Sequence, residues 1–116
     1  MSSPVIYFEI GVRNGEKGKE FYSKMFDWKI NTNMPDYHEI AKDGEGISGG
    51  IFPIKEGEMP PYVTIYVQVD DLQKYLDKAA ELGGKQIVPP TALPPGMGSF
   101  AMFADPDGNC VGLWTV

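Results

Sequence analysis

The chain has 116 residues, the size of one ordinary domain. Sixteen acidic and ten basic residues give a net charge of −6, and an acidic surface repels nucleic-acid phosphates and anionic membranes, so we expect neither as a partner. Because Cys110 is the one cysteine, no intramolecular disulfide can form. No apolar run approaches the ~20 residues of a membrane span, and the first residues lack the basic and apolar regions of a signal peptide, so we expect a cytoplasmic protein.

The first half of the chain predicts a strand, a helix and three further strands. Alternating residues over 5–12 predict a strand with one apolar face, formed by Phe8, Ile10 and Val12, and a mixed face, formed by Tyr7, Glu9 and Gly11. Apolar residues spaced by three and four predict a helix over 16–28. Its apolar face comprises Phe21, Tyr22, Met25, Phe26 and Trp28. Turn-forming residues then separate short strands at about 28–32, 36–42 and 47–54.

The second half repeats this order after a polar linker at 55–61 that is rich in Pro and Gly. A strand follows, with an apolar face formed by Val63, Ile65, Val67 and Val69 and a mixed face formed by Thr64, Tyr66 and Gln68. Asp70-Asp71 can cap the next helix and Gly83-Gly84 can end it. Strands are expected at 85–88, 99–104 and 110–116, with a proline-rich loop at 89–98 and a reverse turn at 105–109.

The two halves are related by a constant offset. Val12 and Val69 each end the strand before a helix and lie 57 residues apart, and Ile30 and Ile87 in the following strands have the same separation. Matching helices in matching places indicate a duplicated module. The sequence therefore predicts an α+β fold built from two tandem βαβββ modules, residues 1–56 and 61–116, within one domain spanning 1–116.

Several segments resemble the signatures of a known family. The first is Phe8-Glu9-Ile10-Gly11-Val12, followed within residues 20–30 by a Phe-Tyr pair and the triplet Phe-Asp-Trp. The others are residues 67–71 leading into 79–85, residues 47–51, and the hairpin Phe103-Ala104-Asp105-Pro106-Asp107-Gly108-Asn109. In their order and spacing these segments resemble the vicinal oxygen chelate superfamily, which includes glyoxalases, bleomycin-resistance proteins and extradiol dioxygenases.

The resemblance implies a cup-shaped mixed sheet with the helices outside and a ligand or metal on the concave face. It also implies a homodimer, since small members of the family usually pair. In such a fold the apolar strand faces would pack on the helices and the mixed faces would line the cup.

The positions that bind a divalent metal in the family's enzymes hold other residue types in this chain. Carried over by position, the ligands fall on Tyr7, Thr64 and Gly112, with the fourth near 50–52. Hydroxyls are poor ligands for such ions and glycine offers none. We therefore expect no metal cofactor; a divalent metal would enter only if this positional transfer is wrong.

Three polar residues, Glu9, His38 and Glu39, allow alternative functional sites. Glu9, His38 and Glu39 contain the residue types of a replacement metal site, although His38 and Glu39 alternate on one strand; we interpret His38 instead as a surface or rim histidine. Glu9 lies between apolar neighbours, which suits a general base with a raised pKa. We favour the simpler interpretation, a carboxylate bonded to a tyrosine hydroxyl such as that of Tyr7 or Tyr66, so no catalytic residue is assigned beyond Glu9 as a candidate.

The mixed strand faces supply candidate ligand-binding residues. They are Tyr7, Glu9, Phe52, Thr64, Tyr66, Gln68, Met102 and Trp114. These side chains either line a pocket, which is typically apolar with a few polar groups, or simply fill a closed cup or a dimer interface. We interpret Cys110 as a half-buried core thiol rather than a nucleophile, and the loop at 89–98 as a connection rather than a lid.

Three functions are compatible with these observations. We favour a metal-independent member of the superfamily that binds a small, partly apolar molecule in its cup, as antibiotic-sequestering members do. The second is a divalent-metal lyase or isomerase of the glyoxalase type, against which Tyr7, Thr64 and Gly112 argue. The third is a non-catalytic dimeric interaction module, against which the polar residues Glu9, Thr64 and Gln68 argue.

Overall fold

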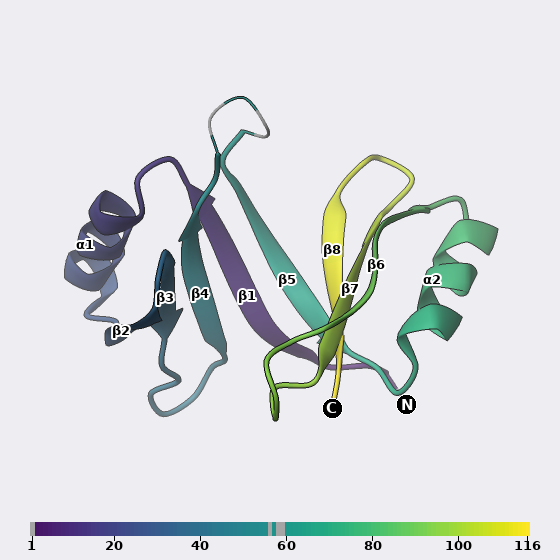
Figure 1. Cartoon of the computed structure of the whole chain (residues 1–116), viewed down its shortest axis with the longest axis horizontal. Helices are drawn as coiled ribbons and strands as arrows, with labels where there is room; N and C mark the ends of the chain where they lie inside the picture. Colours follow the sequence, from purple (N-terminus) through teal and green to yellow (C-terminus); the bar gives the residue numbers. More distant parts are fainter. Residues whose placement is uncertain (1, 56, 58–59) are drawn as a thin grey trace. The chain divides into compact units, whose positions relative to one another are not determined.

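The computed structural model describes residues 2–55, 57 and 60–116 (Figure 1). It confirms the predicted α+β class, with helices and strands in the predicted order. The elements are β1 (Val5–Val12), α1 (Gly15–Phe26), β2 (Ile30–Met34), β3 (Tyr37–Ile40), β4 (Ser48–Pro53), β5 (Tyr62–Gln68), α2 (Leu72–Glu81), β6 (Lys85–Ala92), β7 (Ser99–Ala104) and β8 (Cys110–Thr115). Each half therefore has the order βαβββ.

The chain divides into two compact units. Module 1 comprises residues 7–63, and module 2 comprises residues 64–116 together with the segment that ends at Ile6. The backbone N–H of Gln68 donates to the carbonyl of Pro4 at 2.9 Å, which ties this N-terminal segment to module 2. The division between the units therefore falls within β1, after Ile6.

The strands of each module follow the same order. In module 1 the order is β2-β3-β4-β1, with β1 and β4 parallel and the other neighbours antiparallel. In module 2 the order is β5-β8-β7-β6, again with one parallel pair, β5 and β8. The predicted repeat is therefore present in strand pairing as well as in element order.

The core of module 1 lies between its strands and α1. Ile10, Ile40 and Ile51 are buried at its centre, and Phe8 and Val12 pack against them. Tyr22, Trp28 and Ile30 complete the packing. The predicted apolar face of the first strand is therefore confirmed.

Helix α1 buries less than its periodicity predicts. Tyr22 packs into the core beside Trp28, with ring centroids 5.7 Å apart, but none of the helix residues is fully buried. Phe21, Met25 and Phe26 are exposed by 59%, 60% and 51%. The sheet thus covers only part of the predicted apolar face, because spacing locates an apolar stripe but not how much of it another element covers.

The core of module 2 lies between its strands and α2. Val69, Leu72, Leu76, Ala101 and Leu113 are buried there. The partly buried Val67, Tyr75 and Phe103 pack around them. The predicted apolar face of β5 is only half correct: its second half packs in this way, whereas Val63 and Ile65 are exposed by 68% and 40%, outside the α2 cluster.

The helix ends carry the expected caps. The Asp71 carboxylate accepts a hydrogen bond from the Lys74 backbone N–H at 3.1 Å, which confirms the predicted N-cap of α2. Gly83 follows the helix with a φ of 97°, a left-handed conformation that favours glycine. Asn14 caps α1 in the same way by accepting from Lys17.

Strand β6 is longer than predicted. The sequence predicted a strand at 85–88 and a loop from Pro89, but β6 runs to Ala92 and Thr91 pairs with Phe100 of β7. Strand β6 is the terminal strand of its module, and an edge strand tolerates proline because its outward N–H groups need no partner. The register shift between Val88 and Thr91 spans the two prolines. The connecting loop therefore covers only 93–98.

Two further expectations concern the linker between the halves and membrane-spanning helices. Of the predicted linker at 55–61, residues 56, 58 and 59 lie outside the described part. Among the described residues, no helix has the length and apolar character needed to cross a membrane.

Candidate functional site

The face of module 1 turned away from α1 carries a row of polar residues across three strands. Register pairs Glu9 of β1 with Gly50 of β4, and Gly50 with Glu39 of β3. Residues opposite one another on neighbouring strands point to the same side, so the two carboxylates flank a glycine. Tyr7 and Tyr37 lie two positions earlier on β1 and β3 and share this side. We call Tyr7, Glu9, Tyr37, Glu39 and Gly50 the tyrosine–carboxylate cluster.

The hydroxyls of this cluster are hydrogen-bonded in series. The oxygens of Tyr7 and Tyr37 lie 2.5 Å apart, and the Tyr37 hydroxyl donates to Oε2 of Glu9 at 3.2 Å. Tyr37 has a single hydroxyl proton, so Tyr7 is the donor in the first bond. The expectation that a tyrosine hydroxyl satisfies Glu9 is confirmed, with Tyr37 as a donor.

The glycine at position 50 leaves room for this arrangement. A Cβ atom built there would lie 1.9 Å from the Tyr37 hydroxyl oxygen and 2.9 Å from that of Tyr7. Side-chain atoms do not approach so closely, and Gly50 itself is buried. The Tyr37 hydroxyl therefore occupies the space into which a side chain at position 50 would project.

Burial and negative charge keep the two phenols protonated. Burial is the main cause that raises the pKa of Tyr7 to about 12; the hydrogen bond with Tyr37 lowers this pKa, and the charges of Glu9 and Glu39 contribute to the increase. Burial also raises the pKa of Tyr37, together with its bond to Tyr7 and the charge of Glu9. At neutral pH both hydroxyls of the cluster are therefore uncharged.

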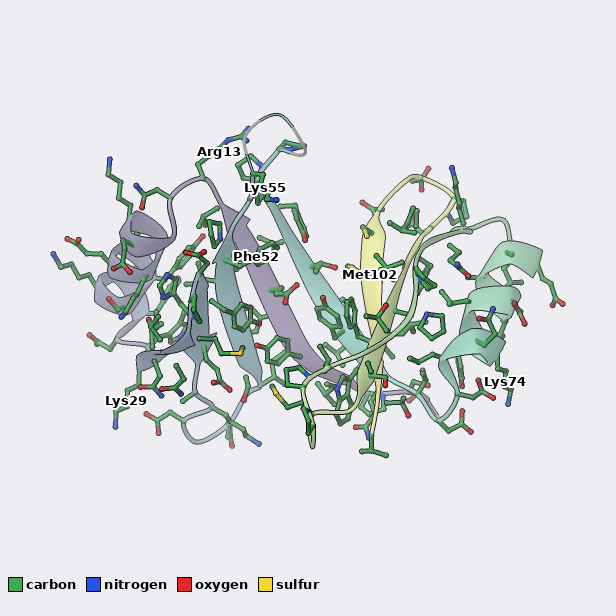
Figure 2. All side chains as sticks on the ribbon, viewed as in Figure 1. Arg13, Lys29, Phe52, Lys55, Lys74 and Met102 are labelled. Carbon is green, nitrogen blue, oxygen red and sulfur yellow. The ribbon has the colours of Figure 1, made fainter. Side chains whose placement is uncertain are left out.

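Aromatic rings border the cluster on the same module. Phe52 follows Ile51 on β4 and lies on the side away from α1 (Figure 2). Its ring contacts that of Tyr62 edge-on, with centroids 5.9 Å apart. The predicted site residues Tyr7, Glu9 and Phe52 are therefore on one face of module 1.

The corresponding face of module 2 is apolar and aromatic. Tyr66 pairs with Gly112, and Gly112 pairs with Met102, which gives a row centred on a glycine as in module 1. Tyr66 and Met102 are each only 8% exposed, and the Tyr66 ring contacts that of Phe100 at 6.5 Å. Figure 2 shows Met102 on the side of β7 away from α2. A Cβ at Gly112 would lie 2.3 Å from the Tyr66 ring.

Three further predicted residues lie on this face of module 2. Thr64 is buried, and its hydroxyl donates to the Cys110 carbonyl at 2.6 Å. The Trp114 indole N–H donates to the Met97 carbonyl at 2.9 Å, which fastens the loop at 93–98 to β8. Gln68 pairs with Trp114 in register. The Cys110 thiol is half-buried, as expected, and burial raises its pKa.

Sequence comparison places these two modules in a known family. A family model described as "Glyoxalase/Bleomycin resistance protein/Dioxygenase superfamily" matches residues 5–113. The chain belongs to this superfamily. The resemblance noted in the sequence is thereby confirmed.

Individual members of the superfamily are similar over most of this chain. "Putative glyoxylase CFP32" of Mycobacterium tuberculosis is 33% identical over 104 residues. The match covers 83% of this chain and 39% of the relative, so the chain spans about two-fifths of that protein's length. The "Glyoxylase-like domain-containing protein" of Didymella fabae is 30% identical over 92% of this chain and 89% of its own. A crystal structure of a superfamily member from Vibrio splendidus 12B01 has the same fold, with a TM-score of 0.67 and 15% identity over 99% of this chain and 100% of the other.

The residues to which the family resemblance assigns metal ligands do not have the chemistry of a metal site. The hydroxyls of Tyr7 and Thr64 are bonded to Tyr37 and to a backbone carbonyl. The glycines at positions 50 and 112 lie under tyrosine side chains. None of these positions supplies an imidazole or a carboxylate, which are the donors that suit Zn, Ni, Mn or Fe.

The alternative metal site is not assembled either. His38 and Glu39 point to opposite sides of β3, as expected: Glu39 is exposed, whereas His38 is 3% exposed on the side of α1. Among the described residues, no three His, Cys, Asp or Glu side chains gather closely enough to hold a metal ion. Glu9 and His38 therefore do not share a site.

The interpretation of His38 as a surface or rim histidine was wrong. Its Nδ1 lies 2.7 Å from the Thr32 hydroxyl, and its Nε2 lies 4.0 Å from the Glu16 carboxylate of α1. Gly15 makes this possible, since a Cβ there would lie 3.0 Å from Nε2. The histidine is thus a structural link between α1 and β3.

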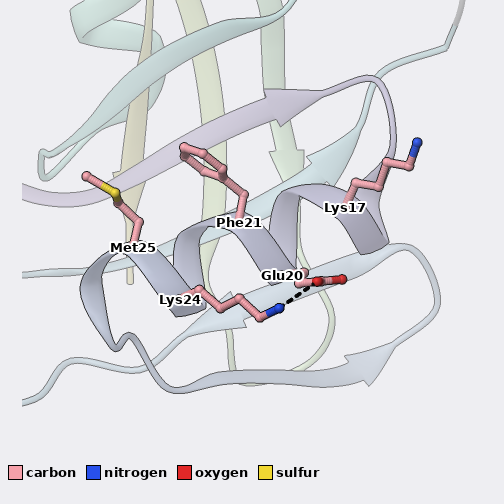
Figure 3. A pocket seen from close by; sticks show the side chains of 5 residues that line it. All are labelled: Lys17, Glu20, Phe21, Lys24 and Met25. Atoms are coloured by element: carbon pink, nitrogen blue, oxygen red, sulfur yellow. Dashed lines mark hydrogen bonds and ion pairs between the residues drawn. The ribbon is translucent and has the colours of Figure 1, made fainter.

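A surface groove of about 580 Å³ runs along the outer side of α1. Lys17, Phe21, Lys24 and Met25 line it together with Glu20, which forms an ion pair with Lys24 at 2.8 Å (Figure 3). The groove lies on exposed helix residues and contains none of the predicted site residues.

Tyr37 is the main site residue that sequence reasoning missed. It lies on a four-residue strand next to turn residues, so its alternation with Glu39 is short. The one available signal was its position two residues before Glu39, on the same side of the strand.

Proposed function

We propose that this chain is a metal-independent member of the superfamily that binds a small, partly apolar molecule in the concave cup expected for the family. Family membership supports the general class, because the superfamily includes bleomycin-resistance proteins as well as glyoxalases and dioxygenases. The proposal does not assign a catalytic step. In this interpretation Glu9 serves as a binding group.

One observation carries the metal-independent part of the proposal. At the positions to which the family resemblance assigns metal ligands, Tyr7 and Thr64 bond within the protein and Tyr66 covers Gly112; near the fourth, at 50–52, Tyr37 covers Gly50. Restoring a ligand at position 50 would require the Tyr37 ring to move. Lyase or isomerase chemistry of the glyoxalase type, which uses that metal, is correspondingly disfavoured.

The side chains on the module faces support the ligand part. Each face presents aromatic rings beside a few polar groups, the composition typical of small-molecule sites. The predicted binding residues are Tyr7, Glu9, Phe52, Thr64, Tyr66, Gln68, Met102 and Trp114, and each lies on the face of its module turned away from the helix. A sealed core would contain no ionisable carboxylate such as Glu9.

The proposal includes a homodimer that works in the cytoplasm. Exposed apolar residues on α1 and at the start of β5 provide surface that a second copy can cover. A single cysteine suits a reducing compartment. Sedimentation equilibrium tests the oligomeric state.

Calorimetry tests metal independence. Chelator-stripped protein titrated with Ni²⁺, Zn²⁺, Mn²⁺ and Fe²⁺ should show no stoichiometric binding, and elemental analysis of the purified protein should find no bound metal. Binding tighter than about 1 μM, worth roughly 8 kcal/mol, would overturn the metal-independent assignment.

Fluorescence tests ligand binding. The chain has two tryptophans. Trp28 packs in the core between α1 and the strands of module 1, whereas Trp114 lies on the face of module 2 that is turned away from α2, where we propose that ligand binds. In a Trp28→Phe variant the remaining emission comes from Trp114. A ligand library should change this emission, and the reciprocal Trp114→Phe variant should respond much less. The absence of any response across the library would refute the binding function.

A further inference from the structure

The hydrogen-bonding polarity of the tyrosine–carboxylate cluster restricts what can bind to it. The Tyr37 proton is directed at Glu9, and the Tyr7 proton is directed at the Tyr37 oxygen. Both hydroxyl protons are therefore committed inside the cluster. Any further hydrogen bond to these oxygens, or to the carboxylates of Glu9 and Glu39, is one in which they accept.

We propose that the tyrosine–carboxylate cluster of module 1 recognises a protonated amine, a cationic N–H donor carried on a partly apolar molecule. The inference rests on the proposed binding function and specifies its ligand class. A group that reaches the cluster meets acceptors, so it has to be a donor. Among donors, an ammonium is favoured because charge-assisted hydrogen bonds to carboxylates are about twice as strong as neutral ones.

The surrounding charges and rings favour the same class. Glu9 and Glu39 flank the cluster on neighbouring strands, and both raise the pKa of Tyr7, which means that both fields reach its hydroxyl. The rings of Tyr7, Tyr37 and Phe52 add faces that attract cations. An anionic ligand would face two carboxylates and find no donor among the cluster's side chains.

The cluster is accessible on its module. Tyr7, Glu9 and Tyr37 are half-buried rather than buried, and Glu39 is exposed. The oxygens are thus positioned by their mutual hydrogen bonds while the face remains open enough for a ligand group. Partial burial also strengthens each electrostatic contact relative to one made in water.

Three probes of matched shape test the inference. They are 2-phenylethylammonium, 2-phenylethanol and 3-phenylpropanoate, which present a cationic donor, a neutral hydroxyl and an anion on the same phenylethyl frame. Binding is followed by NMR of protein labelled in its tyrosine rings. The ammonium should bind at least tenfold more tightly than the alcohol, and the carboxylate should not shift the Tyr7 and Tyr37 signals.

Variants then locate the preference. Glu39→Gln removes one carboxylate from an exposed strand position and should reduce the preference for ammonium severalfold; Glu9→Gln should reduce it more. Tyr37→Phe leaves the Tyr7 proton without its acceptor in the cluster, so the alcohol should gain relative to the ammonium. Glu20→Gln on α1 removes an exposed carboxylate outside the cluster and should leave all affinities unchanged.

The outcomes separate this inference from the function on which it rests. Equal binding of the three probes, with Tyr7 and Tyr37 signals shifted, would refute the cationic preference and leave small-molecule binding intact. A preference that survives both Glu variants would refute the assignment to this cluster. Failure of every probe to bind more tightly than about 10 mM, roughly 3 kcal/mol, would count against both.

Discussion

Replacing Gly50 by alanine tests the packing on which the site interpretation depends. The added methyl would lie 1.9 Å from the Tyr37 hydroxyl oxygen, whereas an ordinary contact begins at 3.4 Å. The hydroxyl therefore has to withdraw by about 1.5 Å, which breaks its bonds to Tyr7 and Glu9. We expect Gly50→Ala to disrupt the tyrosine–carboxylate cluster while leaving the α1 side of the module intact.

The expected cost follows from three contributions. Loss of two partly buried hydrogen bonds removes about 1 kcal/mol each, and overpacking adds about 1–3 kcal/mol. Because Gly50 does not have a positive φ, alanine returns about 0.4–1 kcal/mol by restricting the unfolded chain. Gly50→Ala should thus lower the free energy of unfolding by about 2–4 kcal/mol, measured by urea denaturation.

A double-mutant cycle identifies the cause. In a Tyr37→Ala background the main obstacle is gone and only the Tyr7 hydroxyl, 2.9 Å from the new methyl, has to shift. Gly50→Ala should then cost little, and the coupling energy should be about 2 kcal/mol. In a Tyr37→Phe background the ring carbon 2.3 Å from the new methyl remains, so the alanine should still be costly. An equal cost of Gly50→Ala in all three backgrounds would refute the claim that Tyr37 occupies the space above Gly50.

Three further changes have defined outcomes. The free energy of unfolding, measured by denaturant titration, should fall between about pH 10 and 12. The reason is that the pKa of Tyr7 is raised to about 12, mainly by burial, so the folded chain keeps a proton that the unfolded chain loses near pH 10. Tyr7→Phe should lessen this fall. Asp71→Ala should cost about 1 kcal/mol through loss of the α2 N-cap, whereas Asp70→Ala beside it should change stability by less than about 0.5 kcal/mol. His38→Ala should cost about 2–4 kcal/mol, because it leaves a cavity between α1 and β3 and removes a hydrogen-bond partner of the Thr32 hydroxyl, which then keeps only its bond from Lys19 among those described; a cost near zero would contradict the buried position of His38.

The fold was predictable because its information is local and repeated. Alternation identifies the strands, and the constant offset between Val12 and Val69 identifies the duplicated module without any knowledge of long-range contacts. The faces of β1 follow from the same alternation. The burial of an apolar face does not follow from alternation. Phe21 and Ile65 belong to apolar faces, but whether another element packs on them depends on helix placement, which spacing does not encode.

The errors in the second module and at His38 have the same origin. The prolines of β6 looked like a loop because a proline in a central strand breaks the ladder, and nothing local reveals that β6 is at the edge. His38 looked peripheral because histidine is seldom buried without a partner. Its partners, Thr32 and Glu16, belong to other elements and come near it only after β2 and α1 pack on β3.

The site was partly predictable for a similar reason. The mixed faces of β1 and β5 follow from alternation, which placed Tyr7, Glu9 and Tyr66 correctly. The hydrogen bond between Tyr37 and Glu9 joins residues 28 positions apart on strands that are not neighbours, and β4 lies between them. Only the register through Gly50 brings them together, and register is a non-local property.

The two modules share one geometry at the positions to which the family resemblance assigns metal ligands, although their chemistry differs. In each, a glycine at the centre of a three-strand row lies under a tyrosine: Gly50 under Tyr37, and Gly112 under Tyr66. A single substitution such as Tyr7→His would add an imidazole but leave both tyrosines in place, so it should not create a tight metal site. In module 1 the tyrosine donates its proton to the carboxylate of Glu9, whereas in module 2 it packs against Phe100 on a face that lacks a carboxylate in its central row. A tyrosine over a central glycine thus belongs to an acceptor surface in one module and to an apolar surface in the other, which is why the cationic preference is assigned to module 1.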